Sequence, residues 1–255
     1  MRGTRRALLR TGLAGGLGAA AALTLPTQGS ANGVRPPSGK GPHIGILLYE
    51  NFTLLDVAGP LEVLSRAPDA DVSLIADRTG PVRCDTGHAA MVADYALGDH
   101  AKLDVLLVPG GSNDGVTSAG ENSRILDWIR AVDRRTTWTS SVCTGAWVLG
   151  QAGLLRGKRV TTYWAAGPVV EERFGAVYVP ERHVRDGKLL TGAGVSAGQD
   201  MALWLSEKLS DRATAEALEL AVEYDPRPPF GTGNAVEAPQ ERKDLALKLI
   251  EDSLP

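Results

Sequence analysis

The chain is poor in the residue types that build metal centres and disulfide frameworks. Its 255 residues include two cysteines, Cys84 and Cys143, and four histidines, so a framework of several disulfides is excluded. None of these residues stands at the spacing of a Cys/His metal centre. No glycine-rich loop ends in the Lys-Ser/Thr pair of a phosphate-binding loop. We therefore expect neither a metal ion nor another cofactor.

Positive charge and long apolar runs are also scarce. The net charge of −3 leaves no basic surface that would suggest a nucleic acid as partner. The longest uncharged apolar run, residues 11–25, is shorter than the roughly 20 residues that a membrane span needs. Hydrophobic residues make up 43% of the chain, which is enough to bury the core of one large α/β domain or two small ones.

The N-terminal segment, residues 1–31, has the composition of an export signal. Arg5 and Arg6 stand side by side ahead of the apolar run, and Gly29 and Ala31 are placed like a small-residue cleavage site. The arginine pair resembles that of a twin-arginine signal, so we expect a protein exported to the periplasm or beyond the cell, with no stable membrane span after cleavage. A disordered tail or an uncleaved anchor is the alternative.

From His43 onward, strand-like and helix-like segments alternate. Residues 32–42, rich in Pro and Gly, are expected to be a linker, and residues 43–255 a single domain. The alternation predicts an α/β fold of the flavodoxin-like type, with a doubly wound, mostly parallel sheet and helices on both faces. We expect strands at 43–49, 71–77, 103–111 and 136–142, short exposed strands within 82–97, a hairpin at 176–194, helices at 59–67, 121–134, 197–223 and 240–254, and a loop at 225–234.

Cys143 follows the strand that ends at Val142 and precedes a helix-like run. A side chain at such a strand-to-helix turn projects from the top of the sheet, as in a nucleophile elbow. The helix N-terminus is expected to lower the pKa of the thiol and to favour the reactive thiolate. A buried structural cysteine is the alternative.

Two further points lie where ligands bind in such folds, beyond the carboxyl ends of strands. Gly110 and Gly111 end a buried strand, and their amides, with that of Thr144, are expected to stabilise negative charge on a bound atom; a plain turn is the alternative. Asp56 is expected in a loop before the first helix, where an apolar setting would raise its pKa and let it carry a proton, or where it caps the helix. His183 is the histidine that a Cys–His hydrolase would use, although a solvent-facing strand position explains it more simply.

Five segments in this order resemble the ThiJ/PfpI superfamily (class I glutamine amidotransferase-like), and within it most closely the isonitrile hydratases. The resemblance covers about His43 to Phe230. It implies the same α/β fold, a homodimer, and hydration of isonitriles to N-substituted formamides. The segments are LLDVAGPLEV, LDVLLVPGG, SVCTGAWVLGQAGLLRGKRVTTYW, ERHVRDGKLLTGAGVSAGQDMAL and EYDPRPPF.

Carried over by motif, the resemblance gives Cys143 the role of nucleophile and Asp56 that of the required acidic residue. Thr144 matches the residue after the nucleophile, which the hydratases also use, and Gly111 matches the glycine on the oxyanion side. Tyr163 stands in TTYW, where these sequences usually have Thr-Thr-His-Trp, so the pocket is expected to differ in polarity.

Other readings of the same motifs remain. Certain regulators share SVCTGA, but the 25 residues after Phe230 are too few for their two-part DNA-binding region. A non-catalytic ligand-binding or redox-sensing domain would keep the fold and use Cys143 as a reversible oxidation site. Another small-molecule cysteine hydrolase or lyase of the superfamily, such as a glyoxalase- or amidase-like enzyme, is a further alternative, disfavoured because no histidine adjoins the cysteine.

Overall fold

The apolar runs of the sequence form the strands of one central sheet. The computed structural model describes residues 40–99 and 102–255, and in these residues a seven-stranded sheet has the order β10-β11-β7-β6-β1-β2-β5. Every neighbouring pair in it is parallel except β10 and β11. The strands are β1 His43–Leu47, β2 Asp71–Ala76, β5 Tyr95–Ala96, β6 Val105–Val108, β7 Trp138–Val142, β10 His183–Asp186 and β11 Leu189–Gly192.

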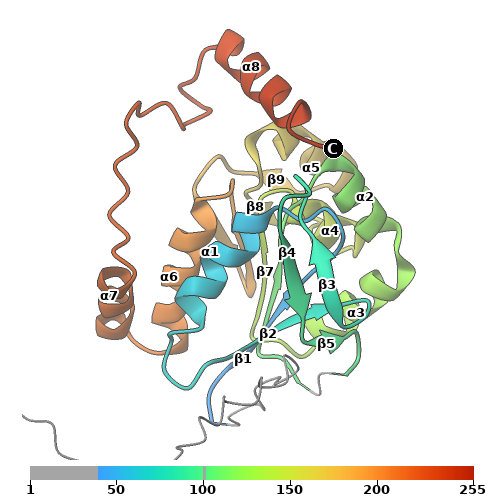
Figure 1. Ribbon diagram of the computed structural model, residues 1–255, viewed down its shortest axis with the longest axis vertical. Helices are drawn as coiled ribbons and strands as arrows, with labels where there is room; N and C mark the ends of the chain where they lie inside the picture. Colours follow the sequence, from blue (N-terminus) through green and yellow to red (C-terminus); the bar gives the residue numbers. More distant parts are fainter. Residues whose placement is uncertain (1–39, 100–101) are drawn as a thin grey trace, which may run out of the picture. The chain divides into compact units, whose positions relative to one another are not determined.

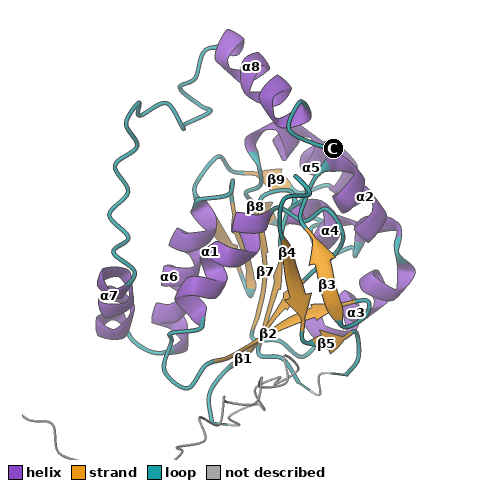
Figure 2. Ribbon diagram, in the orientation of Figure 1, coloured by secondary structure: helices purple, strands orange, loops and turns teal. Residues whose placement is uncertain are grey.

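Helices cover both faces of this sheet, as Figures 1 and 2 show. On one face α1 packs against α6, and on the other α2 packs against α3 and α4. This is the predicted doubly wound arrangement, and the α/β prediction is confirmed. The helices are α1 Leu54–Leu64, α2 Asn113–Glu121, α3 Ser123–Asp133, α4 Gly145–Gln151, α5 Gly167–Phe174, α6 Ala197–Leu209, α7 Arg212–Ala221 and α8 Gln240–Glu251. Two small sheets pair β3 Gly80–Arg83 with β4 Ala90–Ala93, and β8 Arg159–Val160 with β9 Val177–Tyr178.

The first helix begins earlier than predicted. It starts at Leu54, with Thr53 as its N-cap, so Asp56 lies in the first turn of α1 and not in a preceding loop. The prediction placed the helix start at Gly59 because Pro60 suits a first turn. Here Pro60 lies inside the helix instead. The side chain of Asp56 is thereby fixed on a regular element of the fold.

Two other boundaries were wrong for local reasons. The expected helix at 197–223 is two helices, because the side chain of Asp211 caps a new helix by accepting a hydrogen bond from the Thr214 amide. The expected hairpin at 176–194 is confined to β10 and β11, which turn at Gly187 with φ of 64°. Its first part, β9, pairs with β8 in a separate sheet. Helices α2 and α5 were not predicted.

The core is filled by the central strands, and the strand register brings three loops together. β1, β6 and β7 are direct neighbours and parallel, so the loops after Leu47, Val108 and Val142 meet at one edge of the sheet. All described residues belong to one compact unit, 36–255. The expected signal at 1–31 and most of the expected linker at 32–42 lie outside the described residues. Among the described helices, none has the length and apolar character of a membrane-crossing segment.

Candidate active site

Cys143 lies on a strained strand-to-helix turn. Its φ is 56°, in the left-handed region that residues other than glycine rarely adopt. Two strand-end carbonyls hold this conformation, since the Cys143 amide donates to the oxygens of Gly192 at 3.0 Å and Ala193 at 2.6 Å. The Thr162 hydroxyl donates to the Cys143 carbonyl at 2.8 Å. The expected elbow geometry is therefore present.

The turn is tight enough to require glycine after Thr144. A Cβ on Gly145 would lie 2.2 Å from the Val108 carbonyl oxygen, so only a residue without a side chain lets α4 begin this close to β6. The sequence Cys-Thr-Gly thus has a structural reason, because Cys143 adopts the positive φ of the turn and Gly145 leaves room for the neighbouring strand.

The Cys143 thiol is buried, with 7% of the residue exposed. Burial raises its pKa well above the ordinary value, and the nearby carboxylate of Asp56 raises it further. Hydrogen bonds from the backbone and side chain of Thr144 act in the opposite direction but are the smaller effect. The structure thus differs from the expectation of a resting thiolate, because desolvation outweighs the donors at the start of the helix. The raised pKa favours the neutral thiol over the thiolate in the resting site.

Asp56 is the charged partner of this thiol. It is fully buried, and its Oδ2 accepts a hydrogen bond from the Gly110 amide at 2.9 Å. Burial raises the pKa of Asp56 to about 7; the Gly110 hydrogen bond lowers it, the Asp85 charge raises it, and interaction with Cys143 lowers it. Oδ1 is buried without a hydrogen bond of ordinary geometry to any described residue. This side chain does not cap its helix, because it bonds a residue 54 positions away.

The glycines of the β6 loop are already engaged. The Gly110 amide binds Asp56, and the Gly111 amide donates to Thr144 Oγ1 at 3.0 Å, while the Thr144 hydroxyl donates back to the Gly111 carbonyl at 3.0 Å. A Cβ on Gly110 would lie 2.6 Å from Asp56 Oδ2 and 2.7 Å from Thr144 Oγ1. The expected role of both amides as oxyanion donors therefore does not follow from this geometry. Their hydrogen bonds position Asp56 and Thr144 instead.

Tyr163 and His183 occupy different surroundings. Tyr163 is half-buried, and its pKa is raised mainly by burial and further by its electrostatic interaction with Cys143. His183 stacks at a tilt on Trp204, with ring centroids 6.0 Å apart. Among the described residues no histidine contributes to the pKa shift of Cys143. The arrangement thus gives no support to a Cys–His pair.

Tyr49 belongs to this cluster and was missed in the sequence. It follows β1 and is buried, and its hydroxyl donates to the Pro109 carbonyl at 2.6 Å. Burial raises the pKa of Tyr49 well above its ordinary value, and the charges of Asp56 and Cys143 raise it further. The signal available was a single tyrosine that ends the apolar run IGILLY, residues 44–49. A buried tyrosine hydroxyl needs a partner, but the sequence does not say which one.

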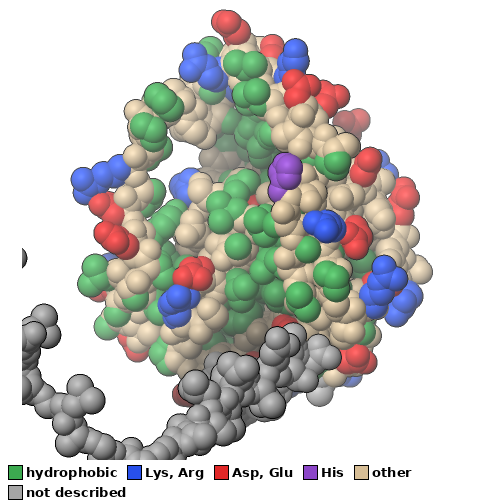
Figure 3. Space-filling model, viewed as in Figure 1, with side chains coloured by type: hydrophobic (Ala, Val, Ile, Leu, Met, Phe, Trp, Pro, Cys, Tyr) green, Lys and Arg blue, Asp and Glu red, His purple; other side chains and the backbone are tan. Residues whose placement is uncertain are grey.

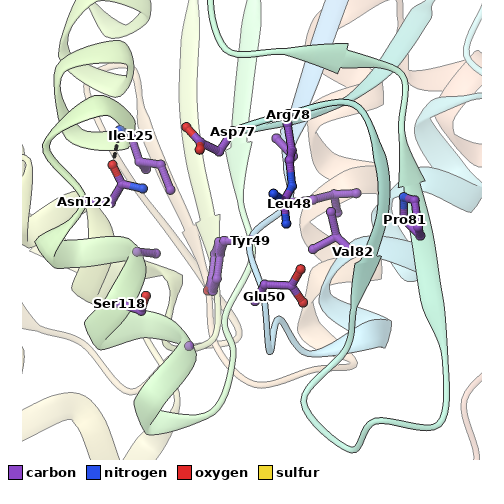
Figure 4. Close-up of a pocket in the computed structure, with 13 residues that line it drawn as sticks. Leu48, Tyr49, Glu50, Asp77, Arg78, Pro81, Val82, Ser118, Asn122 and Ile125 are labelled. Atoms are coloured by element: carbon purple, nitrogen blue, oxygen red, sulfur yellow. Dashed lines mark hydrogen bonds between the residues drawn. The ribbon is translucent and has the colours of Figure 1, made fainter.

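A cavity of about 270 Å³ lies on the β1–α2 side of Tyr49. Figure 4 shows Tyr49 between Glu50 and Leu48 on one side and Ser118 of α2 on the other. Neither Cys143 nor Asp56 lines it. The lining residues are Leu48, Tyr49, Glu50, Ala76, Asp77, Arg78, Pro81, Val82, Gly115, Ser118, Ala119, Asn122 and Ile125.

No cluster of three His, Cys, Asp or Glu side chains within the described residues has the arrangement of a metal site. The chemistry that the arrangement offers comes from its own side chains. A neutral thiol sits beside a buried carboxyl group that changes its protonation state near neutral pH, which suits nucleophilic attack coupled to proton transfer.

Comparison with known proteins places the chain among relatives of known structure and activity. Residues 42–208 match the model of the DJ-1/PfpI family. The chain is 42% identical over 211 residues to an isonitrile hydratase of Pseudomonas putida, covering 83% of this chain and 91% of the relative.

Solved structures support the same placement. A crystal structure of a ThiJ/PfpI family protein from Pseudomonas syringae superposes with a TM-score of 0.78 and 32% identity, over 91% of this chain and 95% of that one. DJ-1beta of Drosophila melanogaster, at 22% identity and a TM-score of 0.63, covers 72% of this chain and 98% of its own and shares the fold.

Proposed function

The chain belongs to the DJ-1/PfpI family, and from this premise we propose that it hydrates isonitriles to N-substituted formamides, with Cys143 as nucleophile and Asp56 as proton carrier. It is a homologue of the Pseudomonas putida isonitrile hydratase over most of its length. The observation that carries the proposal is the pairing of a neutral thiol at an elbow with a buried carboxyl group whose pKa is about 7.

In the first step the sulfur of Cys143 attacks the terminal carbon of the isonitrile while its proton passes to the Asp56 carboxylate. The resulting carboxylic acid gives that proton to the same carbon. The S–H bond is thereby replaced by one S–C and one C–H bond, and an S-bound thioimidate, R–N=CH–S, forms with no change of oxidation state outside the substrate. A base with a pKa near the working pH serves both transfers well.

In the second step water adds to the thioimidate carbon. Asp56 takes a proton from the water and delivers it to the nitrogen, which gives R–NH–CH(OH)–S. The C–S bond then breaks, the hydroxyl proton returns to the sulfur through the same carboxylate, and the formamide R–NH–CHO leaves. One carboxyl group therefore suffices for the cycle.

The neighbouring residues support these two groups. The Thr144 amide interacts with the sulfur and lowers its pKa, while the Thr144 hydroxyl ties the Gly111 turn to the elbow. Gly110 positions the Asp56 carboxylate. Tyr163 interacts electrostatically with Cys143, and we assign to it contact with the R group of the substrate, through a larger and less basic ring than imidazole.

The protonation state of Cys143 argues against the redox-sensing alternative. Sensor cysteines are exposed and carry a lowered pKa, since the thiolate is the form that peroxides oxidise. Cys143 is buried with a raised pKa. It becomes nucleophilic only while Asp56 accepts its proton.

A homodimer is part of the proposal. Leu54 and Leu55, which precede Asp56 on α1, are 37% and 42% exposed. Figure 3 shows hydrophobic side chains over one face of the molecule, with charged ones mostly toward its outline. Apolar surface next to a site is typical of an interface. Light scattering at micromolar concentration should give twice the mass of one chain, and the mass of a single chain would contradict this.

Export through a twin-arginine-like signal is likewise proposed, on the basis of Arg5, Arg6 and the small residues Gly29 and Ala31. The mature protein should begin at Asn32 by N-terminal sequencing, and replacing both arginines with lysine should retain it in the cytoplasm. Detection of only the intact Met1 form in the cytoplasm of the wild type would contradict the proposal.

The activity is tested by formamide formation from simple alkyl isonitriles. Cys143→Ala should abolish turnover and leave the thermal melt unchanged within a few degrees. Cys84→Ala, which removes the other buried thiol, is the matched control and should retain turnover. Failure of the purified wild type to turn over any of several isonitriles would reject the proposed reaction.

A further inference from the structure

One peptide group connects Tyr49 to Asp56. The Pro109 carbonyl and the Gly110 amide belong to the same peptide unit, which planar resonance makes a single dipole. Tyr49 donates to the carbonyl end at 2.6 Å, and the amide end donates to Asp56 Oδ2 at 2.9 Å. The tyrosine hydroxyl and the carboxylate are thus joined in a chain of two hydrogen bonds.

Chains of this kind strengthen cooperatively. A hydrogen bond accepted by a carbonyl draws electron density toward its oxygen and makes the N–H of the same peptide a stronger donor. The effect is greatest where water is absent, and here Tyr49, Pro109, Gly110 and Asp56 are all buried. The tyrosine ring also packs closely against this loop, because a Cβ on Gly111 would lie 3.1 Å from it.

We propose that Tyr49 is a positioning residue for Asp56, whose hydroxyl holds and polarises the Pro109–Gly110 peptide so that its N–H stabilises the ionised carboxylate. The inference rests on the proposed role of Asp56 as proton carrier. In this proposal Tyr49 lowers the pKa of the Asp56 carboxyl group toward neutral pH, whereas burial alone would keep the group protonated to higher pH.

The other titratable groups around Asp56 act differently. The Asp85 carboxylate, which accepts a hydrogen bond from Thr53 at 2.6 Å, raises the pKa of Asp56 by its charge. The Cys143 thiol lowers it. Tyr49 is itself kept protonated by burial, since its pKa is raised well above its ordinary value. It therefore remains a neutral donor across the whole range in which Asp56 titrates.

The test measures the ionisation of Asp56 directly, without substrate. The carboxyl ¹³C shift of Asp56 in ¹³C-aspartate-labelled protein, assigned by its loss in Asp56→Asn, is followed from pH 4 to 10 in wild type and in Tyr49→Phe. Loss of the polarising bond should raise the midpoint by up to roughly 0.7 pH units, since cooperative strengthening is about 10–30% of a charged hydrogen bond. The low-pH limb of Cys143 alkylation by iodoacetamide should move upward by the same amount.

Ser140→Ala is the matched control. The Ser140 hydroxyl is fully buried and donates to the Leu106 carbonyl at 2.8 Å, so its removal also leaves a buried strand carbonyl without a side-chain donor. It is not joined to the peptide that binds Asp56. Both variants should melt at lower temperature than wild type, but only Tyr49→Phe should shift the Asp56 midpoint.

Three results would overturn the proposal: a midpoint in Tyr49→Phe that stays within about 0.1 unit of wild type or falls, an equal shift in Ser140→Ala, or a wild-type Asp56 that shows no titration between pH 4 and 10. The measurement is independent of the proposed reaction. An upward shift in a protein that turns over no isonitrile would sustain the role of Tyr49 and reject the substrate class.

Discussion

Replacing Asp56 with asparagine should inactivate the protein and at the same time stabilise it at high pH. The side chain is fully buried, and its pKa rises from 3.8 to about 7 on folding. A carboxyl group with a raised folded-state pKa binds its proton more tightly in the folded chain. It therefore opposes folding once the pH is high enough to ionise it in the unfolded chain.

The sign and size of this effect follow from the shift. Below pH 3.8 the group is protonated in both states and costs nothing. Between pH 3.8 and about 7 it ionises only on unfolding, and the cost grows by 1.36 kcal/mol per pH unit until the folded carboxyl also ionises. The cost is about 2 kcal/mol at pH 5 and about 4 kcal/mol at pH 8.

Asparagine keeps the oxygen that accepts from Gly110 but carries no titrating proton. The free energy of unfolding of Asp56→Asn relative to wild type should therefore increase by about 2–3 kcal/mol between pH 5 and pH 8. Any pH-independent change in packing or hydrogen bonding cancels from this difference. Urea unfolding at the two pH values, followed by circular dichroism, measures it.

The same variant should lose about 10²–10⁴-fold in isonitrile hydration, the usual contribution of a positioned acid–base group. A helix cap with an ordinary pKa would show neither effect, and a buried carboxyl group without a catalytic role would show only the effect on stability. If the stability difference between variant and wild type is the same at pH 5 and pH 8, the raised pKa is refuted. If Asp56→Asn retains most of the wild-type rate, the proton-carrier role is refuted.

Three other predictions concern the residues around this pair. Thr144→Val should leave the Gly111 amide unpaired, at a cost of about 1–3 kcal/mol in the free energy of unfolding measured in urea. It should lose less activity than Asp56→Asn, whereas Thr144→Ser, which keeps the hydroxyl, should retain activity. A fully active Thr144→Val would contradict this prediction. Gly110→Ala should lose at least about 10-fold in turnover and about 1–3 kcal/mol of stability, because its Cβ would stand 2.6 Å from Asp56 Oδ2; normal kinetics and melting would show that the loop relaxes freely. Tyr163→His should change the ratio of kcat/KM between bulky and small isonitriles while Cys143 alkylation persists, and an unchanged ratio would remove Tyr163 from the substrate pocket.

The sequence predicted the elbow around Cys143 but not the protonation states of the side chains near it. Cys143 follows a strand with small residues around it, and this local pattern correctly indicated the elbow, whose φ in the structure is positive. The parallel strand order also placed the loops after β1, β6 and β7 together. The turn depends on neighbouring residues in the sequence, and the meeting of the loops depends on the strand order, so both can be predicted from the sequence.

What the sequence could not supply depends on partners far apart along the chain. A helix start behind Cys143 predicted a thiolate, yet burial among three loops outweighs it and keeps the thiol neutral. The amides of Gly110 and Gly111 were expected to face a substrate, and each is instead occupied by a side chain from another element. Asp56 was assigned to a loop because Pro60 was given the first turn of its helix.

These differences change the chemistry that the site is suited for. A stable thiolate would depend on a protonated Asp56 for the proton that completes the addition to an isonitrile carbon, whereas a neutral thiol brings its own proton with it. The buried carboxyl group, which interacts with the side chain of Cys143, can accept that proton and return it to carbon. Burial raises the pKa of both groups, and this suits the addition of sulfur and a proton to the same isonitrile carbon. The same burial keeps the cysteine in its less oxidisable form until a substrate occupies the site.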